Sequence, residues 1–309
     1  MSLGSLGLSA PLLQACAALG YQEPTPVQAA VIPDILAGRD VWAKASTGTG
    51  KTAAFVLPIL EALGPLTLPR FTRALILVPT RELAKQTLDV ISSLRAYLPQ
   101  RPKTVAVLGG VSINPQMMEL RGGAEIIVAT PGRLLDLVSK NALHLDTVRQ
   151  LVLDEADRLM DNNFNEELAQ IIALLPASRQ TLLFSATFSP ALKKLEKSLM
   201  RDPVRVDVAE PATELPAITQ RAIEVDAPRR TQLLVKLLET HEWERVLVFV
   251  GTTHATQHVA AKLQAKGINA EPLSGEMSQG ARNKALEMFR KSQVHVLVAT
   301  DLASRGLDI

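Results

Sequence analysis

Short apolar runs, many of them rich in β-branched residues, alternate along the chain with longer amphipathic stretches. Such an alternation predicts buried parallel strands that are connected by helices. Helical patterns cover residues 51–63, 81–94 and 165–175, and a further helix is expected to start at Pro131 with the side-chain oxygen of Thr130 as its N-cap. The expected strands are residues 41–43, 74–79, 104–108, 125–129, 150–154 and 181–184.

The alternation stops over residues 209–218, where prolines favour an extended path. We place a linker between two domains there. The pattern then resumes, and the strands expected in this second part are residues 219–225, 246–250, 268–273 and 294–299.

Two apolar strings of the first part recur in the same order in the second. Residues 75–80 resemble residues 247–252, and residues 126–130 resemble residues 296–300. Two repeated strings in the same order favour a duplicated α/β unit with equivalent loops at the ends of its strands.

Composition narrows the class of protein. The chain has 309 residues, of which 47% are apolar and 21% charged, as in an ordinary globular protein of about two domains. No apolar run approaches the roughly 18 residues that span a bilayer, so no membrane partner is expected. The single cysteine, Cys16, excludes an internal disulfide and fits a cytoplasmic location. Because the net charge is only +2 and aromatic residues make up 4%, nucleic-acid binding would require a local arrangement of side chains.

A glycine-rich loop follows one predicted strand and opens a predicted helix, which is the context of a phosphate-binding loop rather than of a simple turn. Backbone N–H groups of such a loop surround phosphate oxygens, while Lys51 would reach the β- and γ-phosphates and Thr52 would bind Mg²⁺. Ala45 stands in place of the usual first glycine. The loop residues are Ala45, Ser46, Thr47, Gly48, Thr49, Gly50, Lys51 and Thr52.

Two adjacent carboxylates, Asp154 and Glu155, directly follow another apolar strand. Ligands bind at this end of the strands in open α/β sheets. Asp154 is expected to hold Mg²⁺ through its waters, and Glu155 to orient and deprotonate the attacking water. Together with Lys51, these two residues are the predicted catalytic groups, although such a pair alone would also suit a solvated loop.

The motifs together resemble those of the DEAD-box RNA helicases. The family is named after the motif that here is Asp154-Glu155-Ala156-Asp157, and Gly20 followed by Pro24-Thr25-Pro26-Val27-Gln28 resembles its adenine-recognising segment. The resemblance implies that Gln28 and Asp301 bind nucleotide, that Arg305 assists catalysis, and that Asp157, Ser185 and Thr187 couple ATP to unwinding. The RNA-binding residues that it implies are Pro79, Thr80, Arg81, Gly110, Thr130, Arg133, Gly251, Thr252, Arg282 and Thr300.

The resemblance also implies a fold and an activity. The fold is α/β, with two RecA-like parallel-sheet domains in tandem: residues 1–208, which include the adenine segment 1–28, and residues 219–309, the second being incomplete at its carboxyl end. The activity is that of an ATP-dependent RNA helicase, which binds ATP, Mg²⁺ and the RNA backbone independently of sequence and locally unwinds short duplexes. An ATP-switched RNA clamp with little turnover and a DNA-stimulated ATPase are the alternatives.

Two departures from the family pattern give further expectations. Leu3 stands where the family usually has an aromatic residue against the base, and it would offer apolar contact without stacking. The chain stops at Ile309, before the family's last arginine motif, so weak hydrolysis is expected, and residues 294–299 are expected to form an unpaired edge strand. Each motif residue could also have a purely structural role; Arg81 and Arg133, for example, could be solvated helix residues.

Overall fold

The structure, a computed structural model, describes residues 2–46, 48–66, 68–160, 164–208 and 219–300. The chain divides into two compact units, Met1–Thr213 and Glu214–Ile309, and each is described by itself. The expected linker, residues 209–218, lies outside the described residues.

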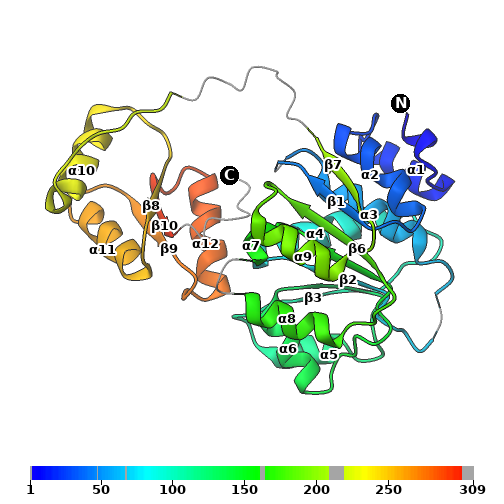
Figure 1. Cartoon of the computed structure of the whole chain (residues 1–309). Helices are drawn as coiled ribbons and strands as arrows, with labels where there is room; N and C mark the ends of the chain where they lie inside the picture. Colours follow the sequence, from blue (N-terminus) through cyan, green and yellow to red (C-terminus); the bar gives the residue numbers. More distant parts are fainter. Residues whose placement is uncertain (1, 47, 67, 161–163, 209–218, 301–309) are drawn as a thin grey trace. The chain divides into compact units, whose positions relative to one another are not determined.

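The first unit is built on a parallel sheet in the order β3-β4-β2-β5-β6-β1-β7 (Figure 1). Sequence patterning missed β7, because this strand alternates half-buried valines with the exposed residues Arg205 and Asp207. Among the described strands it pairs only with β1, at the edge of the sheet. The strands are β1 (Val41–Lys44), β2 (Ala74–Leu77), β3 (Thr104–Val107), β4 (Ile126–Ala129), β5 (Gln150–Leu153), β6 (Gln180–Ser185) and β7 (Val204–Asp207).

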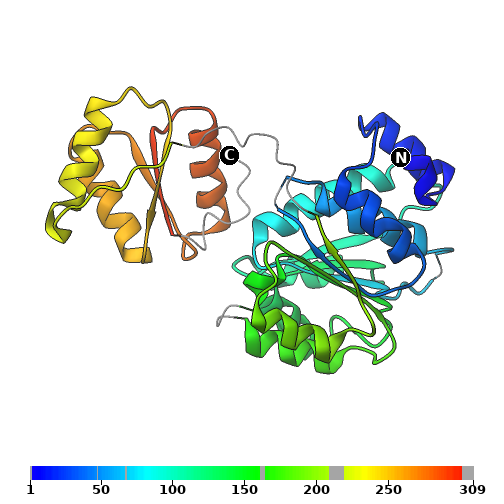
Figure 2. The same ribbon diagram turned by 45° about the horizontal axis from the view of Figure 1, so that its top comes forward.

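Helices cover both faces of this sheet, as Figures 1 and 2 show from two directions. Successive residues of a strand point to opposite faces, so Ile76 packs into one core while its neighbours Leu75 and Leu77 pack into the other. The first core is closed by η1 (Leu3–Leu6), α1 (Ala10–Ala18), α2 (Pro26–Leu36), α3 (Lys51–Ala62) and α4 (Arg81–Arg95). The second is closed by α5 (Ile113–Glu119), α6 (Pro131–Ser139), α7 (Ala156–Leu159), α8 (Asn165–Leu174) and α9 (Pro190–Leu199).

The second unit has a parallel sheet in the order β8-β10-β9, made of β8 (Val246–Val250), β9 (Ala270–Leu273) and β10 (Val296–Thr300). The helices α10 (Arg230–Thr240), which follows η2 (Ala227–Arg229), and α11 (Thr253–Gln264) pack on one face, and α12 (Gln279–Arg290) packs on the other.

Two expectations for the second unit are wrong. Residues 219–225 are mostly exposed and form no strand with any described part of the chain, so their β-branched residues have no partner for pairing. Residues 294–299 are not an unpaired edge, because β10 pairs with β8 on one side and β9 on the other. The central place suits a strand whose residues from Val296 to Ala299 are all buried.

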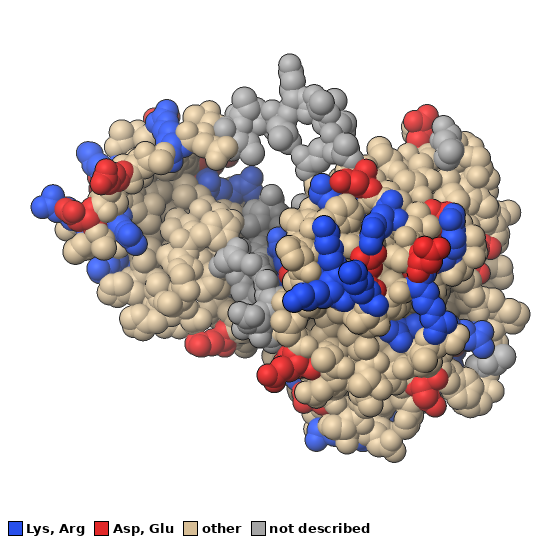
Figure 3. Space-filling view, in the orientation of Figure 1, with Lys and Arg blue, Asp and Glu red and all other residues tan. Residues whose placement is uncertain are grey.

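Charged side chains of both signs lie on the face of the first unit that Figure 3 draws. Figure 3 shows Lys and Arg side chains over the part of the first unit where Figure 1 draws α9, with Asp and Glu side chains among them. The exposed lysines of α9 are Lys193, Lys194 and Lys197. Within the described residues, no helix combines the length and apolarity needed to cross a membrane.

Candidate functional site

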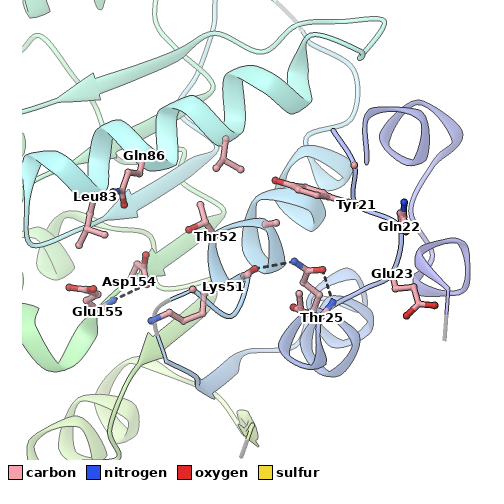
Figure 4. A pocket seen from close by; sticks show the side chains of 16 residues that line it. Tyr21, Gln22, Glu23, Thr25, Lys51, Thr52, Leu83, Gln86, Asp154 and Glu155 are labelled. Atoms are coloured by element: carbon pink, nitrogen blue, oxygen red, sulfur yellow. Dashed lines mark hydrogen bonds between the residues drawn. The ribbon is translucent and has the colours of Figure 1, made fainter. Parts of the chain in front are cut away.

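A cavity of about 500 Å³ lies at the carboxyl edge of the first sheet (Figure 4). Its walls come from the segment before α2, the loop between β1 and α3, the helix α4 and the end of β5. Because all the strands are parallel, segments distant in sequence meet at this one edge. The lining residues are Gly20, Tyr21, Gln22, Glu23, Thr25, Gln28, Gly48, Gly50, Lys51, Thr52, Ala53, Leu83, Gln86, Val90, Asp154 and Glu155.

The phosphate-loop residues that the structure describes run from β1 into α3. Gly48 and Gly50 have φ values of +81° and +87°, a conformation that residues with a Cβ rarely adopt. Gly50 is the N-cap of α3, and no described side chain caps the helix, whose first residues line the cavity. Uncapped N–H groups at the start of a helix favour the binding of an anion. Thr49 Oγ1 donates to Ser46 O at 2.7 Å, which closes the turn. Ala45 is buried behind the loop, whereas Thr47 lies outside the described residues.

Gln28 joins the adenine-side segment to the phosphate loop. Its side chain is buried, with 5% of its surface exposed. Its Oε1 accepts a hydrogen bond from Thr25 N–H at 3.0 Å as part of a capping box, and its Nε2 donates to Gly50 O at 3.2 Å. The expected role in reading the base edge stays a prediction, and the structure adds a bond to the phosphate loop that the motif did not reveal.

The acidic pair lies at the carboxyl end of β5, where Asp154 N–H donates to Leu77 O at 3.0 Å. Asp154 and Glu155 are each 4% exposed. Burial raises the pKa of Asp154, and the Lys51 ammonium opposes part of that rise. Burial likewise raises the pKa of Glu155, opposed by the Arg158 guanidinium, which lies 3.3 Å from Glu155 Oε2.

The backbone of this acidic turn has an unusual conformation next to the cavity. Glu155 has a φ of +49°, a strained value for a residue with a side chain and one that is found at functional sites. Figure 4 shows Lys51 reaching toward the side of the cavity where Asp154 and Glu155 lie, with Thr52 beside them. Buried carboxylate oxygens and a hydroxyl are the hard donors that Mg²⁺ prefers, so these residues fit the ion that the motif implies.

The three residues expected to couple ATP to unwinding, Asp157, Ser185 and Thr187, meet between the carboxyl ends of β5 and β6. Thr187 Oγ1 donates to Asp157 Oδ2 at 3.4 Å, and Ser185 Oγ donates to Thr187 O at 2.7 Å. Ser185 is fully buried and also accepts from Trp42 Nε1 at 3.4 Å. A contact therefore runs from the acidic turn after β5 to the segment after β6, which in turn is bonded to β1, the strand that precedes the phosphate loop.

The RNA-motif residues of the first unit lie at the carboxyl ends of β2, β3 and β4, which are neighbours in the sheet. Pro79 and Thr80 follow β2, and Thr80 Oγ1 caps α4 by accepting from Leu83 N–H at 3.3 Å. Arg81 begins α4, and its guanidinium packs against Gly110 in the loop after β3.

Thr130 and Arg133 come from the loop after β4. The expected N-cap bond of Thr130 is not formed, because Thr130 Oγ1 instead accepts from Gly109 N–H at 3.2 Å. Arg133 is mostly buried, and its Nε lies 3.4 Å from Asp136 Oδ2 in an ion pair. Its Nη1 has no hydrogen-bond partner within the described residues, so this guanidinium retains a free donor.

In the second unit, Gly251 and Thr252 follow β8, and Thr252 Oγ1 caps α11 by accepting from Ala255 N–H at 3.1 Å. Thr300 ends β10, the neighbour of β8, so these residues share one edge. Arg282 on α12 is buried and donates to Ser274 O at 3.2 Å, and its RNA contact stays a prediction. The remaining expected residues, Asp301 and Arg305, lie outside the described residues.

The sequence analysis did not predict the aromatic residue that lines the cavity. Leu3, expected beside the base, is 6% exposed, belongs to the first core and does not line the cavity. Tyr21 does line it, on the side away from Asp154 in Figure 4. The position of Tyr21 between Gly20 and Pro24, within the adenine-recognising segment, could have indicated this residue. A tyrosine ring offers both an apolar face and a hydroxyl to a ligand.

Comparison with known families agrees with this geometry. Residues 25–195 match the DEAD/DEAH box helicase family, and residues 229–309 match the helicase conserved C-terminal domain. The chain therefore belongs to the DEAD/DEAH box helicase family, and the resemblance stated from its motifs is confirmed.

Relatives with curated names extend the comparison over the whole chain. ATP-dependent RNA helicase DeaD of Escherichia coli strain K12 is 40% identical over 309 residues, which are 100% of this chain and 48% of that protein. DEAD-box ATP-dependent RNA helicase 28 of Arabidopsis thaliana is 42% identical over 311 residues, covering 98% of this chain and 39% of that one. This chain thus spans about half the length of the DeaD protein, or less than half of the plant relative.

Solved structures resemble the chain as well. Dbp5 of S. cerevisiae, bound to RNA and ADP BeF3, matches with a TM-score of 0.85 at 27% identity, covering 99% of this chain and 77% of that one. A DEAD box protein of Methanococcus jannaschii matches with a TM-score of 0.64 at 35% identity, covering 100% of this chain and 82% of that one. The α/β fold with tandem RecA-like domains is thereby confirmed.

Proposed function

We propose that this chain carries the ATP-dependent RNA helicase activity of its family: it binds ATP and single-stranded RNA, hydrolyses the ATP and separates short duplexes. One observation carries the proposal. The sheet order β3-β4-β2-β5-β6-β1 groups the RNA-motif loops on β3, β4 and β2, next to the acidic turn of β5, the coupling segment of β6 and the phosphate loop of β1.

The nucleotide end of this arrangement suits ATP. The uncapped first turn of α3 and the Lys51 ammonium would bind the phosphates, and Tyr21 and Gln28 would contact the base. Thr52 and Asp154 would hold Mg²⁺, which supplies neutralising charge to the phosphates when bound. The Glu155 carboxylate would accept a proton from the attacking water. The printed names of DeaD and the ligands of the Dbp5 structure support this choice of nucleotide.

The RNA end suits a backbone ligand. Thr80, Arg81, Gly110, Thr130 and Arg133 supply helix ends, a glycine loop and guanidinium groups, which are the usual partners of sugar and phosphate rather than of base edges. Binding that is indifferent to sequence follows from such contacts. We also propose a cytoplasmic location for the protein. Cys16 is buried, and the sequence contains no second cysteine with which it could form a disulfide.

The test measures binding of a labelled single-stranded RNA to the 309-residue chain by fluorescence anisotropy, with and without ADP and beryllium fluoride. We expect the nucleotide analogue to tighten RNA binding, and RNA to tighten nucleotide binding by the same factor. Lys51→Ala should shift the nucleotide effect to higher nucleotide concentration, whereas Lys194→Ala on α9 serves as the control. DNA of the same sequence should bind more weakly, because it lacks the 2′-OH.

Steady-state ATPase measurements with RNA or DNA as stimulant complete the test. Hydrolysis by the 309-residue chain is expected to be weak, and its stimulation by RNA supports the helicase proposal. Equal stimulation by DNA would favour the DNA-dependent ATPase, and nucleotide-dependent RNA binding without single-turnover hydrolysis would favour the clamp.

A further inference from the structure

The loop of residues 108–112, which joins β3 to α5, is held from inside by one buried side chain. Gln116 lies on α5 and is 7% exposed. Its Oε1 accepts a hydrogen bond from Leu108 N–H at 2.9 Å, and its Nε2 donates to Leu108 O at 3.1 Å and to Ser112 O at 3.2 Å. One carboxamide thus uses its acceptor and both of its donor hydrogens on the two ends of the same loop.

The middle of this loop contacts two RNA-motif residues. Gly109 N–H donates to Thr130 Oγ1 at 3.2 Å. Gly110 has a φ of +69°, and a Cβ added there would overlap the Arg81 guanidinium. The Arg81 guanidinium therefore lies in close contact with the loop at Gly110, so a change in the conformation of the loop changes the surface against which this cation packs.

We propose that Gln116 is a positioning residue for RNA binding, which holds the loop in the conformation where Gly110 packs against Arg81 and does not itself touch RNA. This inference rests on the proposed function. An apolar side chain at this place would leave the Leu108 N–H and two carbonyls without their partner, and the loop would sample other conformations. RNA affinity falls in proportion to the fraction of molecules in which the competent loop remains populated.

The experiment compares Gln116→Leu with Gln150→Leu in the full 309-residue chain. Gln150 is a matched control, because it is 8% exposed, lies in the same unit and bonds Gln180 Oε1 at 2.8 Å, but at the amino end of β5, away from the RNA loops. RNA affinity is measured by anisotropy well below the unfolding temperature, and backbone exposure by amide hydrogen exchange.

Gln116→Leu should weaken RNA binding about tenfold, the equivalent of one or two hydrogen bonds, and should leave nucleotide affinity in the absence of RNA unchanged. The amides of Leu108 and Gly109 should exchange faster. Gln150→Leu should lower the unfolding temperature but not the RNA affinity. Gln116→Glu, which keeps the size and the acceptor but sets a carboxylate against two carbonyl oxygens, should reproduce the RNA defect.

Two outcomes overturn the inference alone: faster exchange in the loop with unchanged RNA affinity, or equal losses of RNA affinity in the Gln116 and Gln150 variants. Arg81→Ala, measured in parallel, separates these from failure of the proposed function. If Arg81→Ala binds RNA as well as the parent chain, the proposed RNA surface is wrong, and the inference about Gln116 falls with it. If Arg81→Ala weakens binding and both Gln116 variants do not, only the inference fails.

Discussion

Gly50→Ala tests the link between the phosphate loop and the adenine-side segment. The φ of +87° at this position would cost an alanine about 1–2 kcal/mol of stability. The added Cβ would also lie 2.7 Å from Gln28 Nε2 and 3.0 Å from Thr25 Oγ1. Gln28 would have to move, and its bond to Gly50 O would be lost.

Leaving a buried amide without a partner costs roughly a further 1–3 kcal/mol, so Gly50→Ala should destabilise the first unit by about 2–5 kcal/mol in total. Gly38→Ala is the matched control. Its φ of +77° imposes the same backbone strain, but no atom lies within 4 Å of the added Cβ, and Gly38 does not line the cavity. Gly38→Ala should lower the free energy of unfolding by only about 1–2 kcal/mol.

The assay is urea unfolding of both variants in a Trp243→Phe background, in which the buried Trp42 is the single tryptophan and reports on the first unit. Titration with a fluorescent ADP analogue gives the nucleotide affinity. Only Gly50→Ala should weaken nucleotide binding, since only this change displaces Gln28. Equal losses of stability in the two variants, with equal nucleotide affinities, would refute the argument that Gln28 holds the loop.

Three further predictions concern single side chains. Lys51→Ala should lower ATP affinity roughly 10- to 100-fold by calorimetry, the worth of a hydrogen bond to a charged group, and an unchanged affinity would contradict the phosphate site. Arg133→Ala should reduce the slope of log affinity for RNA against log salt by about 0.7, whereas Lys194→Ala should leave it unchanged; a loss confined to one RNA sequence would indicate base contacts instead. Asp154→Asn should raise the unfolding temperature without Mg²⁺ at neutral pH, because burial raises the pKa of this carboxyl and its ionised form therefore opposes folding. That gain should shrink as the pH falls toward about 4, where the carboxyl becomes protonated in both states, and a lower unfolding temperature at neutral pH would contradict the reasoning.

The sequence alone determined most of the local structure. Runs such as residues 126–129 are apolar on both faces, and a buried parallel strand is the structure that satisfies such a run. The phosphate loop was equally readable, because the spacing of its glycines before Lys51 reflects backbone conformations that are required within a few consecutive residues. The motif residues and the family followed from the same short-range signals.

The predictions from sequence were wrong or incomplete where the structure of a segment depends on its packing partners rather than on its own residues. The strand β7 was missed because an edge strand needs burial on fewer sides, and residues 219–225 were mistaken for a strand because β-branched residues favour pairing only where a partner is present. The sequence offered Leu3 only as the nearest equivalent of the family's aromatic residue; Leu3 packs into the core, and Tyr21 lines the cavity.

Tertiary structure alone decided which strands are neighbours and hence which loops meet. The order that places β10 between β8 and β9 comes from hydrogen bonds between strands more than twenty residues apart, and no run of residues encodes it by itself. The bonds of Gln28 to Gly50 and of Gln116 to the loop of residues 108–112 depend likewise on how separate segments pack. A carboxamide takes the partners that folding brings within about 3 Å, so its role is fixed only when the chain has closed around it.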